Sequence, residues 1–193
     1  MKMTPDPLAI TNMKTLLLLR HGKSSWKNTT LSDHDRPLKK RGREAAQRMG
    51  RLLSELLLVP DHILTSSAAR ALETAQLAVE AAKFPGQVET VPALYRADPQ
   101  SLVAIVSHVP DRFASVLIIG HNPGLEDWLA RLIGRRETVS TAALAQVELP
   151  VESWLDFSPD TRGELKGLWR PSELILASGA ASAPGEFATE PGD

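Results

Sequence analysis

Four consecutive leucines lead directly into a polar triplet in the stretch Leu16-Leu17-Leu18-Leu19-Arg20-His21-Gly22. An apolar run of this kind that ends abruptly is typical of a fully buried strand, although four leucines can equally begin a helix. Taken as a strand, the run predicts that Arg20, His21 and Gly22 leave the carboxyl end of a buried central strand.

Strand and helix patterns alternate along the rest of the chain. Helical spacing of apolar residues predicts one helix near residues 45–56 closed by Pro60, one over 68–82 with Ser66 or Ser67 as its N-cap, a short one over 102–106, and one over 125–133 stopped by Gly134. Short apolar runs predict further strands over 63–64, 116–119, 144–149 and 165–169. This alternation predicts an α/β fold, a three-layer sandwich with a mainly parallel central sheet.

Three of the predicted strands end in residues that can carry chemistry. The first delivers Arg20-His21-Gly22, the second Thr65-Ser66-Ser67 with Arg70, and the third Gly120-His121-Asn122. Open α/β sheets bind their ligands beyond the carboxyl ends of the strands. If these strands are parallel, the three clusters meet at one edge of the sheet and form a single site.

Length and composition restrict the class of protein. The 193 residues suit one compact domain, and a net charge of −1 argues against a basic surface that coats nucleic acid. The absence of cysteine excludes a disulfide framework, a thiolate nucleophile and a zinc–thiolate site. No run approaches the roughly 18 apolar residues that span a membrane. We therefore expect a cytoplasmic protein with neither nucleic-acid nor membrane partners.

The two ends of the chain differ in composition from its centre. Residues 1–13 contain two prolines and little pattern, and we expect them to form a loose arm. Residues 177–193 are rich in Ala, Gly, Ser, Pro and Glu, and such a segment buries too little apolar surface to offset its ordering entropy. We expect a folded domain over residues 14–176 and a disordered tail over 177–193.

The residue types at the three strand ends suit phosphoryl transfer. A phosphate group needs several positive donors around its oxygens, and Arg20 and Arg70 can supply planar guanidinium forks. The neutral imidazole of His21 can attack phosphorus and form a phosphohistidine that water later cleaves. With His121, these residues make an anion pocket that needs no metal.

Each of these residues also has an ordinary structural interpretation. His21 can be a hydrogen-bonded surface residue, Arg70 a solvated helix residue, and His121 part of a Gly-His-Asn-Pro-Gly turn. No comparable group of reactive residues accompanies His34, His62 or His108 in the sequence, so we predict structural roles for them. No histidine spacing supports a metal site, and we expect neither metal nor cofactor.

Four motifs in the chain resemble those of the histidine phosphatase superfamily, which includes the phosphoglycerate mutases. They are residues 16–23, Asp35-Arg36-Pro37-Leu38 with Arg41-Gly42, residues 64–70 with Glu73-Thr74-Ala75, and Ile119-Gly120-His121-Asn122-Pro123. Together they are similar to the SixA-type phosphohistidine phosphatase branch. The resemblance runs from about residue 14 to residue 171, and it implies a phosphoglycerate-mutase-like α/β fold.

The resemblance also implies roles for individual residues. His21 matches the histidine that is phosphorylated, and Arg20 and Arg70 match the two phosphate-binding arginines. His121 matches the second histidine, which helps to stabilise the transferring phosphoryl group. Arg36 matches a recurrent position of the SixA-type branch, where a role in guiding substrate is expected. The implied function is a metal-independent phosphatase that acts on phosphohistidine in a protein.

Arg96 departs from the family pattern. Many members carry a glutamate in the segment that corresponds to Ala93-Leu94-Tyr95-Arg96, where it protonates the leaving group. An alkoxide needs such an acid, whereas the nitrogen of a phosphohistidine can leave already protonated. Asp98 or Glu89 could substitute for the missing acid. The chain also lacks the large insertions with which mutases enclose a sugar phosphate, so we expect an open site suited to a protein surface.

Four other functions are alternatives to a phosphohistidine phosphatase, and each predicts different sequence features. A small-molecule phosphomonoesterase would use the same pocket. A mutase is disfavoured by Arg96 and by the short chain. A non-catalytic module that binds phosphorylated ligands would keep the arginines and lose the nucleophile, yet His21 and His121 are both present. A plain structural domain leaves the convergence of the strand ends unexplained.

Overall fold

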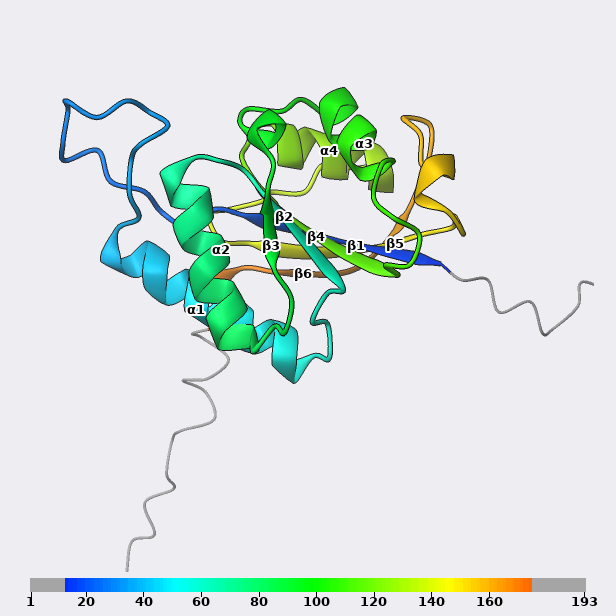
Figure 1. Ribbon diagram of the computed structural model, residues 1–193, viewed down its shortest axis with the longest axis horizontal. Coiled ribbons are helices and arrows are strands. Elements are labelled where there is room, and N and C mark those ends of the chain that lie inside the picture. The colour runs from blue at the N-terminus through cyan, green and yellow to red at the C-terminus, as the bar shows by residue number, and fades with distance from the viewer. Residues whose placement is uncertain (1–12, 175–193) are drawn as a thin grey trace, which may run out of the picture.

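The computed structural model describes residues 13–174 (Figure 1). The predicted arm lies outside the described residues except for Met13, and the predicted tail over 177–193 lies wholly outside them. The predicted domain boundaries at residues 14 and 176 therefore stay predictions.

One six-stranded sheet forms the centre of the structure, in the order β3-β2-β4-β1-β5-β6. Strands β1, β4, β2 and β3 run parallel to one another, whereas β5 pairs antiparallel with β1 and β6 pairs antiparallel with β5. The mainly parallel sheet predicted from the sequence is confirmed, and the four leucines belong to a strand. The strands are β1 (Lys14–Arg20), β2 (His62–Thr65), β3 (Val88–Thr90), β4 (Ser115–Gly120), β5 (Leu144–Leu149) and β6 (Glu164–Trp169).

Helices cover both faces of this sheet. Figure 1 shows α1 and α2 on one face and α3 and α4 on the other. The helices are α1 (Lys40–Glu55), α2 (Ala69–Ala82), α3 (Pro99–Val106) and α4 (Gly124–Ile133), with short 3-10 helices η1 (Pro92–Leu94) and η2 (Trp154–Asp156). The predicted three-layer arrangement is therefore present.

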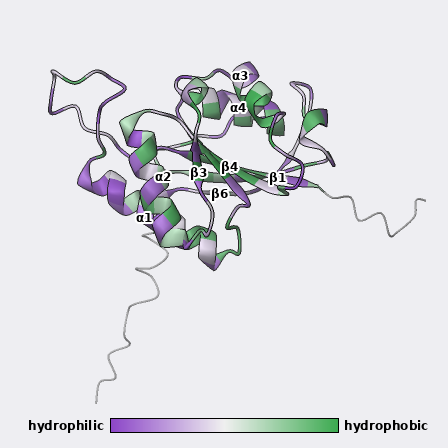
Figure 2. Cartoon of the chain, viewed as in Figure 1, coloured by the Kyte–Doolittle hydropathy of each residue, from purple (hydrophilic) through white to green (hydrophobic). Residues whose placement is uncertain are grey.

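The leucines of β1 explain why a strand can carry four apolar residues in a row. Leu16 and Leu18 pack in one core cluster with residues of α3 and α4, whereas Leu17 and Leu19 pack in a second cluster with residues of α1 and α2. Successive side chains of a strand point to opposite faces, so a strand buried on both faces is apolar throughout. Figure 2 shows this apolar centre, with hydrophilic residues gathered on the outer surface of α1.

Several element boundaries differ from the sequence predictions. The prediction that Ser66 or Ser67 caps α2 is wrong, because Ala68 holds the N-cap position and makes no side-chain cap bond. The first helix ends at Glu55, well before Pro60, and Leu57 follows it in a left-handed conformation with φ of 56°. Strand β3 was not predicted, because it is only three residues long and mostly exposed. Gly134, at φ of 71°, ends α4 as predicted.

Candidate active site

Three adjacent parallel strands deliver polar residues to one edge of the sheet. Arg20 at the end of β1 is in register with Gly120 at the end of β4, and Thr65 at the end of β2 is in register with Ile119. His21, Ser66 and His121 each follow directly after one of these strands. The structure thus brings the three predicted clusters to one place, as the parallel arrangement requires.

His21 is buried and held in one orientation by its own loop. Its Nδ1 lies 2.7 Å from the carbonyl oxygen of Gly22. A carbonyl can only accept a hydrogen bond, so Nδ1 carries the proton and Nε2 carries the lone pair. Burial lowers the pKa of His21 to about 4, against the raising effect of the Gly22 carbonyl and with help from the nearby arginine charges. At neutral pH, His21 is therefore an uncharged imidazole with a nucleophilic Nε2.

Arg70 lies directly against that nitrogen. Its Nε donates to His21 Nε2 across 3.2 Å, and its Nη2 lies 3.0 Å from a carboxylate oxygen of Asp33. Arg70 is the second residue of α2, where helix N–H groups and the helix dipole also favour an anion. The hydroxyl of Thr74 donates to the Arg70 carbonyl and accepts from the Gly22 amide, so it connects α2 to the loop that holds His21.

His121 faces His21 across the site. The ring centroids are 4.9 Å apart, and His121 Nε2 lies 2.8 Å from the hydroxyl of Ser66. Burial, followed by the charges of His21 and Arg70, lowers the pKa of His121 to about 3. Its Nδ1 is buried and has no hydrogen-bond partner among residues 13–174. A neutral His121 can therefore still offer one ring nitrogen to a ligand.

The guanidinium group of Arg20 has one bonded nitrogen and one unbonded nitrogen within the described residues. Its Nη1 donates to the carbonyl of Val139 across 2.8 Å, and Asn122 donates to the same carbonyl across 3.0 Å. Within the described part of the chain, the buried Nε of Arg20 has no partner. Burial lowers the pKa of Arg20, an effect that the charge of Glu126 opposes.

Arg36 forms its hydrogen bonds within its own loop. Its guanidinium donates to the Ser25 carbonyl at 2.9 Å, to the Ser24 hydroxyl at 2.7 Å and to Asp33 at 2.6 Å. The exposed ring of Trp26 covers it at 3.2 Å from guanidinium carbon to ring centroid. The side chain is thus fully engaged with its own loop, which gives no support to the expected direct contact between Arg36 and substrate.

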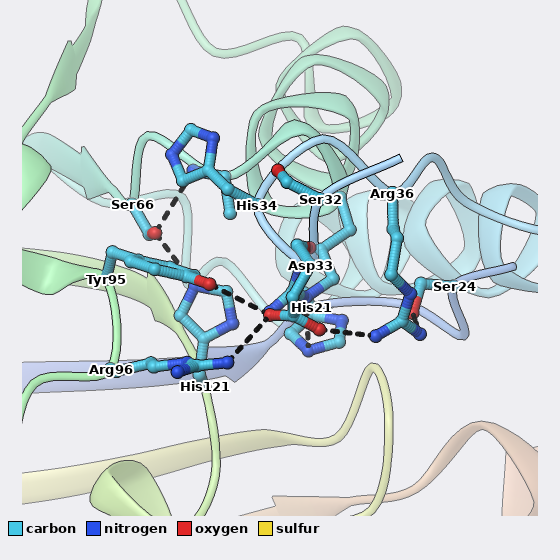
Figure 3. A network of polar contacts seen from close by, with 12 residues as sticks. His21, Ser24, Ser32, Asp33, His34, Arg36, Ser66, Tyr95, Arg96 and His121 are labelled. Atoms are coloured by element: carbon cyan, nitrogen blue, oxygen red, sulfur yellow. Dashed lines mark hydrogen bonds and ion pairs between the residues drawn. The ribbon is translucent and has the colours of Figure 1, made fainter. Parts of the chain in front are cut away.

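Asp33 is a site residue that the sequence prediction missed. Figure 3 shows its carboxylate among Arg36, Tyr95, Arg96 and His21. Burial alone would raise the pKa of Asp33, but hydrogen bonds from Tyr95 and Arg36 and the charge of Arg70 outweigh it and hold the pKa far below its usual range. Asp33 is therefore an anion at any physiological pH. No periodicity or turn signal separates it from its neighbour Asp35.

The remaining histidines lie at different distances from this cluster. His62 stacks on Phe113, and His108 contacts the carbonyl of Ala104, so both occupy structural positions. His34 lies closer to the site, because its Nε2 is 3.0 Å from the Ser67 hydroxyl and its ring meets the Tyr95 ring at 4.9 Å. It forms part of the site rim, which the sequence did not indicate.

The two carboxylates considered as substitute acids are engaged elsewhere. Asp98 caps α3 by accepting from the Ser101 amide at 2.8 Å, and the hydrogen bonds of that cap lower its pKa. Glu89 lies 3.0 Å from Nε2 of His62 on the outer strand β3. Both carboxylates are therefore bonded to groups outside the His21 cluster.

Residues 13–174 contain neither a metal-ligand cluster nor a membrane-spanning helix. No group of three or more His, Asp or Glu side chains in this range could hold a metal ion. None of the described helices is long and apolar enough to cross a membrane. Independence from metal stays a prediction to be tested by experiment.

The depressed pKa of His21 predicts a specific titration. We expect the imidazole nitrogens of His21 to titrate near pH 4 rather than at the ordinary 6.5. Because the folded pKa lies below the unfolded one, the unfolded chain binds more protons between these values, and the free energy of unfolding should fall as the pH drops from 6.5 towards 4. Nitrogen-15 NMR of the imidazoles measures the midpoint, and a His21 midpoint above pH 6 would contradict this account of the site.

The comparisons with known proteins agree with the fold and with the motifs. The family model for the histidine phosphatase superfamily (branch 1) matches residues 16–98. An uncharacterised chloroplastic protein of Arabidopsis thaliana is 34% identical over 178 residues, which cover 84% of this chain and 80% of the relative.

Two solved structures extend this likeness over most of the fold. The protein histidine phosphatase SixA, solved in complex with tungstate, is 25% identical with a TM-score of 0.71, and the match covers 83% of this chain and 99% of SixA. A SixA-type protein of Nakamurella multipartitia is 27% identical with a TM-score of 0.70, over 82% of this chain and 96% of the other. The chain is a phosphatase and belongs to the histidine phosphatase superfamily.

Proposed function

We propose that this phosphatase removes the phosphoryl group from phosphohistidine in a protein, through a covalent phosphohistidine on its own His21. One observation carries the choice of substrate: Asp33, the carboxylate that contacts Arg70 and Arg96, is held as an anion and cannot donate a proton. By the family resemblance, Arg96 occupies the position of the acid. A leaving group that needs no proton from the enzyme fits this site.

The first step forms a bond between His21 Nε2 and phosphorus. The lone pair of Nε2 attacks, and the bond from phosphorus to the substrate nitrogen breaks with its electron pair going to that nitrogen. If the other ring nitrogen of the substrate already carries a proton, the product is a neutral histidine. Arg70, Arg20 and His121 supply hydrogen-bond donors around the transferring group, where charge stabilisation lowers the barrier.

In the second step, water is the nucleophile and His21 is the leaving group. Water attacks phosphorus, and the bond to His21 Nε2 breaks with its electron pair returning to Nε2. Nδ1 keeps its proton and donates it in a hydrogen bond to the Gly22 carbonyl. His21 therefore leaves as a neutral imidazole. Both hydrogens of the water remain with the released phosphate. Neither step requires an acid at the position of Arg96.

A protein substrate is favoured over a small one by the surroundings of the site. Trp26 is 66% exposed in the loop that also carries Asp33, and tryptophan is enriched where proteins contact one another. The Arg96 side chain at the same rim is 69% exposed. The solved relative with tungstate is itself a protein histidine phosphatase. Cytoplasmic residence stays a prediction, and one relative is chloroplastic.

Arg36 supports this function indirectly. Its short contact to Asp33 and its bonds to Ser24 and Ser25 fix the loop between β1 and α1. We propose that Arg36 positions Asp33 and does not itself bind the phosphoryl group.

A substrate screen tests the proposal. It compares a phosphohistidine-bearing protein with a panel of phosphomonoesters, with 3-phosphoglycerate plus a bisphosphate primer as the test for mutase activity. We expect the highest kcat/KM on the phosphohistidine protein. A higher value on a small phosphomonoester would establish the alternative, a small-molecule phosphomonoesterase, and primer-dependent exchange would establish a mutase.

Turnover should not depend on a metal ion. Arg20 and Arg70 can neutralise the phosphoryl group in place of a divalent cation. We expect exhaustive chelation to change kcat on the phosphohistidine protein by less than about twofold. Loss of activity on chelation, with recovery on adding a divalent metal, would show that this expectation is wrong.

A further inference from the structure

The Asp33 carboxylate is bound unequally on its two oxygens. One oxygen, Oδ1, accepts from Arg36 at 2.6 Å. The other, Oδ2, accepts from Arg70 Nη2 at 3.0 Å, from the Tyr95 hydroxyl at 2.9 Å and from Arg96 Nη2 at 3.4 Å. Figure 3 shows Oδ2 directed towards Tyr95 and Arg96. Arg70 donates both to Oδ2 and to His21 Nε2, so Oδ2 is connected to the reacting nitrogen through one guanidinium group.

Only one partner of Oδ2 can be displaced easily. The side chain of Arg70 is 7% exposed and fixed by His21, and Tyr95 packs edge-on against both His34 and His121. Arg96 is 69% exposed, and its contact is the longest of the three. An exposed ion pair of this kind contributes little free energy. A cation brought by a substrate can take the place of Arg96 on Oδ2.

We propose that Asp33 is a specificity-determining residue, whose Oδ2 binds the protonated ring nitrogen of the phosphohistidine leaving group. This inference rests on the proposed function and names the residue that would select its substrate. The N–H of the substrate imidazolium donates to Oδ2, while the phosphorylated nitrogen faces His21 across the pocket. The contact keeps the imidazole in the protonated form that leaves without an enzyme acid.

The same charge disfavours substrates with neutral or anionic leaving groups. A carboxylate beside the phosphoryl site repels a phosphate group unless the substrate carries a positive charge close by. The imidazolium of a phosphohistidine supplies that charge, whereas a sugar phosphate or 3-phosphoglycerate does not. Asp33 therefore acts both by attraction of one substrate class and by repulsion of another.

Within residues 13–174, the charged groups that contact the Asp33 carboxylate are compatible with this role. Arg36 comes from the same loop, Arg70 from α2, and Tyr95 with Arg96 from the segment after η1, while His21 and His121 lie behind them as neutral rings. Hydrogen bonds from Tyr95 and Arg36 and the charge of Arg70 keep Asp33 ionised over the whole range in which phosphohistidine titrates. The pH dependence of binding then follows the substrate and not the protein.

The test compares two small probes, phosphoimidazole and 4-nitrophenyl phosphate, on the full chain. Asp33→Asn should lower the ratio of kcat/KM for phosphoimidazole to kcat/KM for 4-nitrophenyl phosphate by about ten- to a hundredfold. This is the range expected for one hydrogen bond to a charged group. It should also move the alkaline limb of the pH profile of kcat for phosphoimidazole to lower pH by about one unit, because kcat reports the ionisations of the bound complex and an opposite charge raises the pKa of a bound cation by roughly that amount or more. A merely structural role would not move that limb.

Asp35→Asn is the matched control. Asp35 lies on the same loop but is exposed and bonded to Ser32 and His34, outside the His21 cluster. Asp35→Asn should leave the ratio and the pH limb unchanged. An unchanged ratio in a folded Asp33→Asn, or the same fall in Asp35→Asn, would overturn the role of Asp33.

Arg96→Gln provides a second route if Asp33→Asn fails to fold. Removing the competing cation from an exposed position should raise kcat/KM for phosphoimidazole severalfold relative to kcat/KM for 4-nitrophenyl phosphate. A constant or lower ratio of these values would overturn the inference. The role of Asp33 and the proposed function can fail separately. If wild type cleaves phosphoimidazole but the variants do not change the ratio, only the role of Asp33 is wrong. If wild type cleaves neither phosphoimidazole nor a phosphohistidine protein, the proposed function falls with it.

Discussion

His21→Ala is expected to lower kcat by on the order of 10⁴-fold or more, the scale seen when a catalytic nucleophile is removed. The reason is that the variant cannot form the bond from Nε2 to phosphorus, and no other described side chain lies in its place. Rapid quenching of the wild type with radiolabelled substrate should trap an acid-labile phosphoprotein, and His21→Ala should trap none.

His108→Ala is the control for this experiment. His108 is an exposed histidine bonded to the Ala104 carbonyl, and it lies between the end of α3 and the start of β4, whereas the His21 cluster lies at the carboxyl ends of the strands. Its replacement should leave both kcat and the trapped phosphoprotein close to those of the wild type. Turnover by His21→Ala at a rate near that of the wild type would show that the nucleophile is a different group.

The central sheet could be predicted from the sequence because its burial is simple. Strand β1 is covered on both faces, so its apolar run is continuous and easy to read. Strand β3 offered no such signal, since Val88 is its one apolar residue and the strand lies at the edge of the sheet. Burial leaves a pattern in the sequence, whereas hydrogen bonding along an edge does not.

Four residues of the site could be predicted because they follow strands or begin a helix. His21, Arg20 and His121 stand directly at strand ends, and Arg70 opens α2. The topology of a parallel sheet alone is enough to bring such positions together. Their catalytic roles rest on the resemblance and on the geometry, and the kinetic experiments test them.

Asp33 could not be found in this way. It lies in an irregular loop, and its importance depends on partners from α2 and from the segment after η1. Ser66 shows the same limit, because a serine before a helix suggests a cap, yet its hydroxyl also contacts His121. Contacts between segments distant in sequence decide both cases, and no local pattern reports them.

The leaving group should control the rate of the chemical step. We expect phosphorylation of His21 to become faster as the leaving-group pKa falls, with alkyl phosphates slowest, aryl phosphates intermediate and phosphohistidine fastest. Absence of a general acid typically slows a reaction by about 10²- to 10⁴-fold when the leaving group needs a proton. Single-turnover kinetics across a series of phosphate esters measures the slope without interference from product release.

Arg96→Glu should make this dependence shallower. The new carboxyl group would stand beside the Asp33 carboxylate, which Arg96 contacts at 3.4 Å, and a neighbouring negative charge raises the pKa of a carboxyl group. The variant would thus gain a protonated acid, and alkyl phosphates should gain more than aryl phosphates. Arg96→Gln, which removes the charge without adding an acid, should keep the steep slope.

A rate of the chemical step that does not change with leaving-group pKa in the wild type would contradict this expectation. It would mean that an acid already protonates the leaving group, and Asp98 is the candidate to test, because it lies two residues beyond Arg96. If Asp98→Asn then restored a steep slope, Asp98 would be that acid, despite its cap on α3 and its lowered pKa. If Asp98→Asn leaves a steep wild-type slope unchanged, the site works without a general acid, and phosphohistidine is the substrate that such a site can cleave fastest.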